Sequence, residues 1–187
     1  MKSVSRTTLE DTFIILMAAC GVGLKPVVGP LTRMLSSALF IPAGALGGMI
    51  YMVWPCLGLL VTRKTGTATA IGLLEAVIVL VTGIYGSHGI LTLITYVVPC
   101  LVMDGVFMLS GRGAITWLIF LPPACANCTG ALLVGFLIMR MPVIPLLISL
   151  FPAFLAGGVS GFLARGLFQG LTGTFPQFLP ASTAGEG

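Results

Sequence analysis

Long apolar segments lie almost end to end along this chain and are separated only by short polar breaks. A helix that crosses a bilayer needs about 20 predominantly apolar residues, so tight connections leave room for roughly six such helices in this chain. Only 7% of the 187 residues are charged, against about a quarter in an average globular chain. Too few charges remain to cover the surface of a water-soluble fold. We therefore predict an all-α membrane protein, a bundle of six transmembrane helices.

The polar breaks divide the chain into a single transmembrane domain, residues 1–171, and a short tail. The six predicted spans cover residues 11–28, 43–62, 67–84, 89–110, 114–139 and 142–170. Residues 29–42 are too short and too polar for a span, and we expect a loop or a short re-entrant segment there. Residues 172–187 are rich in Gly, Pro, Ser and Thr, and we expect this tail to be disordered.

The distribution of positive charge predicts that both termini are cytoplasmic. With the N-terminus inside, six basic residues fall on the cytoplasmic side: Lys2, Arg6, Arg63, Lys64, Arg112 and Arg165. Three fall outside: Lys25, Arg33 and Arg140. Cytoplasmic loops of membrane proteins carry an excess of Lys and Arg. The net charge of +4 is therefore interpreted as a topology signal in a multi-pass protein of the plasma or inner membrane, and no nucleic-acid partner is expected.

Cys20 offers an alternative to a first spanning helix. Lys2 and Arg6 precede an apolar stretch, and Met17-Ala-Ala-Cys20 resembles a lipoprotein cleavage site. Met17 stands where such a site usually has Leu, and the rest of the chain is membrane-embedded in either case. The membrane helix is the favoured interpretation.

Two carboxylates lie well inside the predicted spans, where ionisable residues are costly and usually face protein or water. Glu75 belongs to a stripe of residues spaced three and four apart, which we expect to face the bundle interior. The stripe consists of Ala68, Gly72, Glu75, Val79 and Thr82. Glu75 either satisfies a buried partner or contacts a ligand, and the sequence leaves both open. Asp104 lies about two turns from the cytoplasmic end of its span, where capping or pairing with a loop group is favoured.

Cys125-Ala-Asn-Cys128 forms a CxxC motif in the fifth predicted span. Such a pair suits a membrane thiol oxidoreductase, but the second, loop-borne cysteine pair of such enzymes is missing. With one CxxC and no histidine in the spans, a zinc site is not expected. No catalytic pattern is present, so we expect a protein that is not an enzyme and has no cofactor.

Several segments of the chain resemble the substrate-binding S components of energy-coupling factor (ECF) transporters. They are Pro42-Ala-Gly-Ala-Leu-Gly-Gly-Met-Ile-Tyr-Met-Val-Trp54, Arg63-Lys64-Thr-Gly66, the glycines Gly83, Gly86 and Gly89, and Asp104-Gly-Val-Phe107. The likeness covers residues 12–112 and is greatest to the branch with thiamine and hydroxymethylpyrimidine S components. It implies a six-helix protein that binds a vitamin or related micronutrient from outside. The protein would then associate with a transmembrane T component and two cytoplasmic ATPases.

The resemblance also implies roles for individual residues. Ala19 and Gly23, four apart in the first span, would dock the T component. The ligand pocket would open outward beneath residues 29–42 and 83–89 and be lined by the last three spans. Its candidate residues are Tyr85, His88, Thr92, Tyr96, Asn127 and Ser149, with Trp54 and Glu75 behind.

The identity of the ligand stays open at this stage. Thiamine-type members have an acidic residue about one turn before the loop glycine, and here that position is Val79. Another vitamin or a tetrapyrrole therefore remains possible. Two other functions also remain: a thiol oxidoreductase using Cys125 and Cys128, and a stand-alone secondary transporter with Glu75 as its coupling carboxylate.

Overall fold

A computed structural model describes residues 6–39, 43–83, 89–110 and 115–174, and these ranges are helical apart from short turns. The elements are α1 (Arg6–Leu39), α2 (Ala43–Tyr51), α3 (Val53–Thr62), α4 (Thr67–Thr82), α5 (Leu91–Leu109), α6 (Ile115–Leu133), the π-helix η1 (Val134–Ile138) and α7 (Val143–Thr174). Five candidate spans in these ranges are long and apolar enough to cross a membrane, and α4 is a shorter apolar helix. The prediction of an all-helical membrane protein is thus confirmed, whereas the count of six spans stays a prediction.

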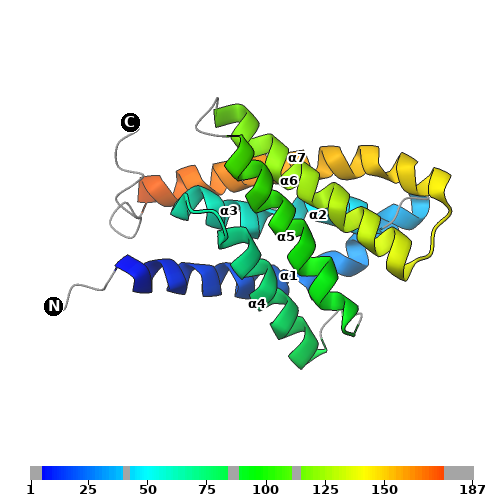
Figure 1. Ribbon diagram of the computed structural model, residues 1–187, viewed down its shortest axis with the longest axis horizontal. Helices are drawn as coiled ribbons and strands as arrows, with labels where there is room; N and C mark the ends of the chain where they lie inside the picture. Colours follow the sequence, from blue (N-terminus) through cyan, green and yellow to red (C-terminus); the bar gives the residue numbers. More distant parts are fainter. Residues whose placement is uncertain (1–5, 40–42, 84–88, 111–114, 175–187) are drawn as a thin grey trace.

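The two longest helices, α1 and α7, frame the bundle (Figure 1). Helices α2 and α3 contact both of them, and α4, α5 and α6 pack in sequence along the chain. The start of α1 and the end of α7 lie at the same end of the molecule (Figure 1). Accordingly, Phe13 of α1 and Phe168 of α7 pack against the same core cluster. This arrangement is compatible with the predicted topology, in which both termini share one side of the membrane.

The expectation of a loop or re-entrant segment over residues 29–42 is wrong for residues 29–39. These residues continue α1, which passes through Pro26 and Pro30 without ending, and residues 40–42 lie outside the described part. Proline is tolerated in membrane helices where neighbouring groups compensate for the lost hydrogen bond. The 34 residues of α1 span about 51 Å, well beyond a hydrocarbon core of roughly 30 Å. Its polar last turns therefore do not all have to lie in lipid.

Other predicted segments also have different ends in the structure. The segment predicted over residues 43–62 breaks at Met52 into α2 and α3, although the two still make one candidate span, Ala45–Thr62. The next helix, α4, ends at Thr82. At the other end of the chain α7 runs to Thr174, so residues 172–174 of the predicted tail are helical.

Small residues on α7 allow it to approach α6 closely. A Cβ on Gly161 would overlap the carbonyl oxygen of Ile119, and one on Gly157 would lie 2.5 Å from the carbonyl oxygen of Pro123. Ala153, on the same side of α7, is fully buried. The glycine and alanine spacing of this helix therefore serves packing within the bundle.

Asp104 of α5 caps the start of α4. Its carboxylate accepts hydrogen bonds from the backbone N–H of Thr69 (2.8 Å), the hydroxyl of Thr69 (2.6 Å) and the backbone N–H of Ala68 (3.4 Å). The residue that precedes α4, Gly66, has no side chain to cap these donors. The capping role predicted for Asp104 is confirmed.

Replacing Asp104 with Ala should destabilise the protein, because the first N–H groups of α4 lose their acceptor. We expect a loss of about 1 to 2 kcal/mol in the free energy of unfolding, the usual range for a lost cap. Unfolding in detergent, followed by circular dichroism, measures it. Thr69→Val removes only the hydroxyl donor and should cost less; equal stability of Asp104→Ala and wild type would contradict the capping role.

Candidate ligand-binding cavity

A cavity of about 600 Å³ lies inside the helix bundle. Its lining comes from the second half of α1, from α2 and the start of α3, the middle of α4, the first half of α5, and the second half of α6 with η1. These segments meet at the end of the bundle away from the start of α1 and the end of α7 (Figure 1). Arg33, Ser37 and Met139 are exposed while Glu75 and Asn127 are buried, so the cavity runs from the surface into the core.

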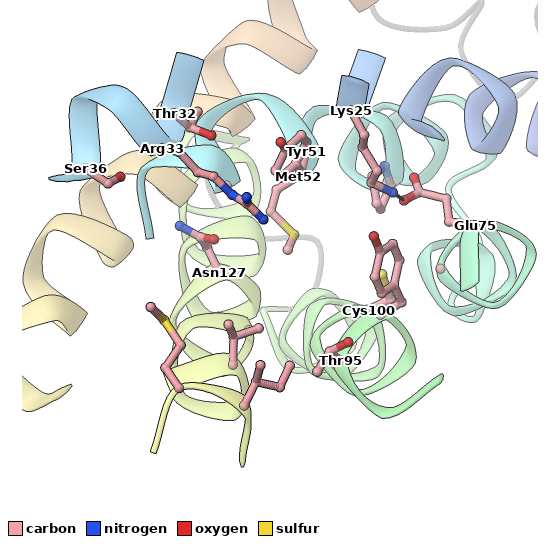
Figure 2. A pocket seen from close by; sticks show the side chains of 18 of the residues that line it. Lys25, Thr32, Arg33, Ser36, Tyr51, Met52, Glu75, Thr95, Cys100 and Asn127 are labelled. Carbon is pink, nitrogen blue, oxygen red and sulfur yellow. Dashed lines mark hydrogen bonds and ion pairs between the residues drawn. The ribbon is translucent and has the colours of Figure 1, made fainter. Parts of the chain in front are cut away.

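A buried ion pair lies in the cavity wall. The Nζ of Lys25 on α1 is 2.5 Å from Oε2 of Glu75 on α4, and the two side chains are only 5% and 7% exposed (Figure 2). The Lys25 ammonium also lies 4.2 Å from the ring centroid of Tyr96 and 6.0 Å from that of Tyr51. Cation–π attraction of this kind is strongest where water is excluded. Two tyrosines and a carboxylate therefore surround the one ammonium.

This pair corrects the count of outside charges. The topology count places Lys25 on the outside, at the outer end of the first predicted span, but its charge is buried against Glu75 within the bundle. A charged side chain inside a membrane protein is stabilised by a partner of opposite sign. Its position therefore reports packing of α1 against α4, and it no longer counts toward the topology.

The absence of a side chain at Gly21 makes room for the Glu75 carboxylate. A Cβ at Gly21 would overlap Oε1 of Glu75 and lie 3.3 Å from Cδ1 of Trp54. Oε1 is buried and has no hydrogen-bond partner among the described residues. In the stripe that carries Glu75, four residues are buried as predicted and Thr82 is exposed.

Asn127 on α6 joins three helices at the cavity wall. Its amide nitrogen donates to the carbonyl oxygens of Ala45 (2.9 Å) and Ala153 (2.7 Å). A Cβ at Gly48 would overlap this amide, so the glycine lets α2 approach α6. Asn127 is a predicted ligand-binding residue, and its side chain lines the cavity. Its amide nitrogen, however, is already engaged in hydrogen bonds that hold the helices together.

The other predicted ligand-binding residues are distributed more widely. Tyr96 and Glu75 line the cavity. Thr92 and Ser149 are buried but are not among its lining residues. The Ser149 hydroxyl donates a hydrogen bond to the carbonyl oxygen of Leu146 in its own helix. Trp54 lines a separate hollow between α2, α3 and α7. Tyr85 and His88 lie outside the described residues. Of the last three predicted spans, α5 and α6 line the cavity, and none of its described lining residues comes from α7.

Cavity residues from the first two predicted spans escaped the sequence argument. The sequence predicts a loop for Thr32, Arg33 and Ser36 and an outside charge for Lys25, but all four residues line the cavity from α1. A usable signal was present for Lys25, because intramembrane charges tend to pair and Glu75 needed a partner. No comparable signal marked Ser36.

The cysteines of the CxxC motif are both half-buried and unbridged, and the Cys128 thiol contacts the carbonyl oxygen of Leu150 at 3.5 Å. Neither is among the residues that line the cavity. Ala19 and Gly23 are exposed on α1, and nothing lies within 4 Å of a Cβ built on Gly23. This open surface is what the predicted docking role requires, and docking itself stays a prediction.

Comparison with known families agrees with a membrane transport role. The sequence model described as "ABC-type cobalt transport system, permease component" matches residues 12–129, more than half of the chain. No curated protein and no solved structure matched. The match supports a membrane component of an ECF-type transporter, and the apolar helices make that component multi-pass. The chain belongs to the family of permease components of ABC-type cobalt transport systems.

Proposed function

We propose that this protein is the substrate-capture (S) subunit of an ECF-type ABC importer in the cell membrane, and that its substrate is a vitamin or related micronutrient. The observation that carries the proposal is the cavity of about 600 Å³ within the helix bundle. Small-molecule sites usually measure about 300–1,000 Å³ and combine apolar walls with a few polar groups. The cavity has this character, with aromatic and thioether side chains beside an ion pair.

The lining of the cavity favours an organic substrate over a bare metal ion. Two basic residues, Lys25 and Arg33, line it, and its carboxylate, Glu75, is already paired with Lys25. A divalent cation such as cobalt would be repelled by this charge. Within the described ranges no three His, Cys, Asp or Glu side chains come together as metal ligands. Flat rings, by contrast, pack well against Tyr51 and Tyr96, which keeps the thiamine and hydroxymethylpyrimidine branch among the candidates.

The position of the cavity supports capture from outside. With the N-terminus in the cytoplasm, α1 leads outward, and the cavity at its far end would open to the exterior. As in a transport system with a permease component, the energy of transport would come from two ATPases, coupled through a T component. The exposed pair Ala19 and Gly23 offers a small-residue surface for that contact.

Native mass spectrometry of the purified protein tests the proposal. We expect the purified protein to carry a bound organic molecule of vitamin size, which is released when the protein is unfolded. Cys125→Ser/Cys128→Ser should retain this molecule in equal amount, because neither cysteine lines the cavity. Loss of the ligand in that variant would favour the thiol oxidoreductase alternative, and substrate uptake into vesicles that hold no ATPase would contradict an S subunit.

A further inference from the structure

We propose that the cavity has an anion-binding subsite formed by Arg33 and Ser36 of α1, so that the substrate is an organic molecule with a carboxylate or phosphate group. This inference rests on the proposed capture function and adds the charge class of the substrate. The subsite is distinct from the Lys25–Glu75 pair, because Arg33 and Ser36 lie two to three helical turns after Lys25 in α1. It is formed by the part of α1 that sequence reasoning expected to be a loop.

Four polar side chains line the cavity from this part of α1: Thr32, Arg33, Ser36 and Ser37. Residues three and four apart share a helix face, so their common orientation follows from the continuation of α1 to Leu39. The hydroxyls of Thr32 and Ser37 donate to the carbonyl oxygens of Gly29 (3.0 Å) and Met34 (2.8 Å). These two hydroxyl groups therefore already donate their hydrogen bonds to the backbone of α1.

Ser36 differs from its neighbours. Only 2% of the residue is exposed, and its hydroxyl oxygen makes no hydrogen bond to any described residue. A buried hydroxyl without a partner costs free energy, which an incoming acceptor recovers. Since Ser36 lines the cavity, a substrate oxygen can be that acceptor.

Arg33 supplies the positive charge of the subsite. In Figure 2 its side chain extends from α1 into the cavity, toward the Asn127 amide. A guanidinium has five N–H donors in a rigid fork, so it can contact protein and still bind a carboxylate or phosphate through two hydrogen bonds. Ser36, three residues further along the same face, adds a neutral donor beside it.

The balance of charge in the cavity points the same way. Among its described lining residues, Lys25 and Arg33 are basic and Glu75 is acidic, so basic groups outnumber acidic ones in the described lining. The nearest other carboxylate along α4 and α5, Asp104, is engaged by Thr69. Such a lining attracts an anionic substrate and repels a cation such as thiamine.

Three probes of nearly equal shape test this directly: nicotinate, nicotinamide and 1-methylnicotinamide, which are anionic, neutral and cationic. We expect the purified protein to bind nicotinate at least about ten-fold more tightly than the other two, because hydrogen bonds to charged groups are the stronger ones. Saturation-transfer NMR at millimolar probe concentration measures the three affinities. Equal affinities, a preference for the cation, or no binding of nicotinate would overturn the proposal.

Variants of the lining residues test whether Arg33 and Ser36 cause the preference for nicotinate. Arg33→Gln should abolish the nicotinate preference, and Ser36→Ala should weaken nicotinate binding several-fold while leaving nicotinamide binding unchanged. Arg140→Gln is the matched control, because Arg140 is also basic and exposed but does not line the cavity. Equal loss in Arg140→Gln and Arg33→Gln would show a long-range charge effect and overturn the subsite.

The two proposals can fail separately. If native mass spectrometry finds a neutral or cationic organic ligand in the purified protein, the capture function stands and the anion subsite falls. If the cavity is found to hold no organic molecule and nicotinate does not bind, both fall.

Discussion

Replacing Lys25 with Met is expected to lower the free energy of unfolding by about 3 to 5 kcal/mol, because it leaves the Glu75 carboxylate buried without its partner. The two groups are 2.5 Å apart and almost fully shielded from solvent. Burial removes the hydration of a charge, and only a nearby opposite charge compensates for that loss. Unfolding of the protein in mixed micelles by increasing amounts of SDS measures the change in the free energy of unfolding.

Two controls separate the ion pair from the general effect of changing a basic residue. Lys64 and Glu10 are also 2.5 Å apart, but the Lys64 side chain is 62% exposed. Exposed pairs contribute little, so Lys64→Met should cost less than about 1 kcal/mol. Lys25→Met/Glu75→Leu should recover most of the stability lost in Lys25→Met, because no unpaired charge remains. Additive losses in the double variant would show that the two residues do not stabilise each other.

The helices follow from the sequence because their cause is local. Runs of apolar residues with few charges predict membrane helices without knowledge of their neighbours, and the structure places helices in each of the six predicted segments. The spacing around Glu75 likewise predicts a buried face from helix periodicity alone. The position of Asp104 near the end of its predicted span favours capping or pairing with a loop group, and the hydrogen bonds from Ala68 and Thr69 are those of a cap.

The cavity could be predicted only in part because its causes are not local. Lys25 and Glu75 are 50 positions apart in the chain, and a charge count treats each charge separately. The last turns of α1 carry Pro30, Arg33 and Ser36, which together are typical of a loop. In the structure these turns are helical, and Arg33 and Ser36 line a cavity, so their polar groups do not have to face lipid. Only the packing of α1 against the other helices creates that cavity.

Gly161 provides a test of the helix packing that supports the cavity. Gly161→Ala is expected to destabilise the protein by about 3 kcal/mol, since the new methyl group would overlap the backbone carbonyl of Ile119 on α6. A flexible side chain could rotate away, but a helix backbone cannot yield without moving the whole of α6. Because Asn127 of α6 also lines the cavity, the same variant should weaken ligand binding. Unfolding in detergent and retention of the bound molecule measure the two effects.

Gly166→Ala is the matched control for Gly161→Ala. It lies one to two turns further along α7, it is exposed, and nothing lies within 4 Å of its added Cβ. Alanine favours the helix over glycine by up to about 1 kcal/mol, so this variant should be as stable as wild type or slightly more so, with ligand binding intact. Opposite signs for the same chemical change on one helix would attribute the loss to contact with α6. If both variants behaved alike, the close approach of α6 and α7 at Gly161 would not be what holds the cavity wall in place.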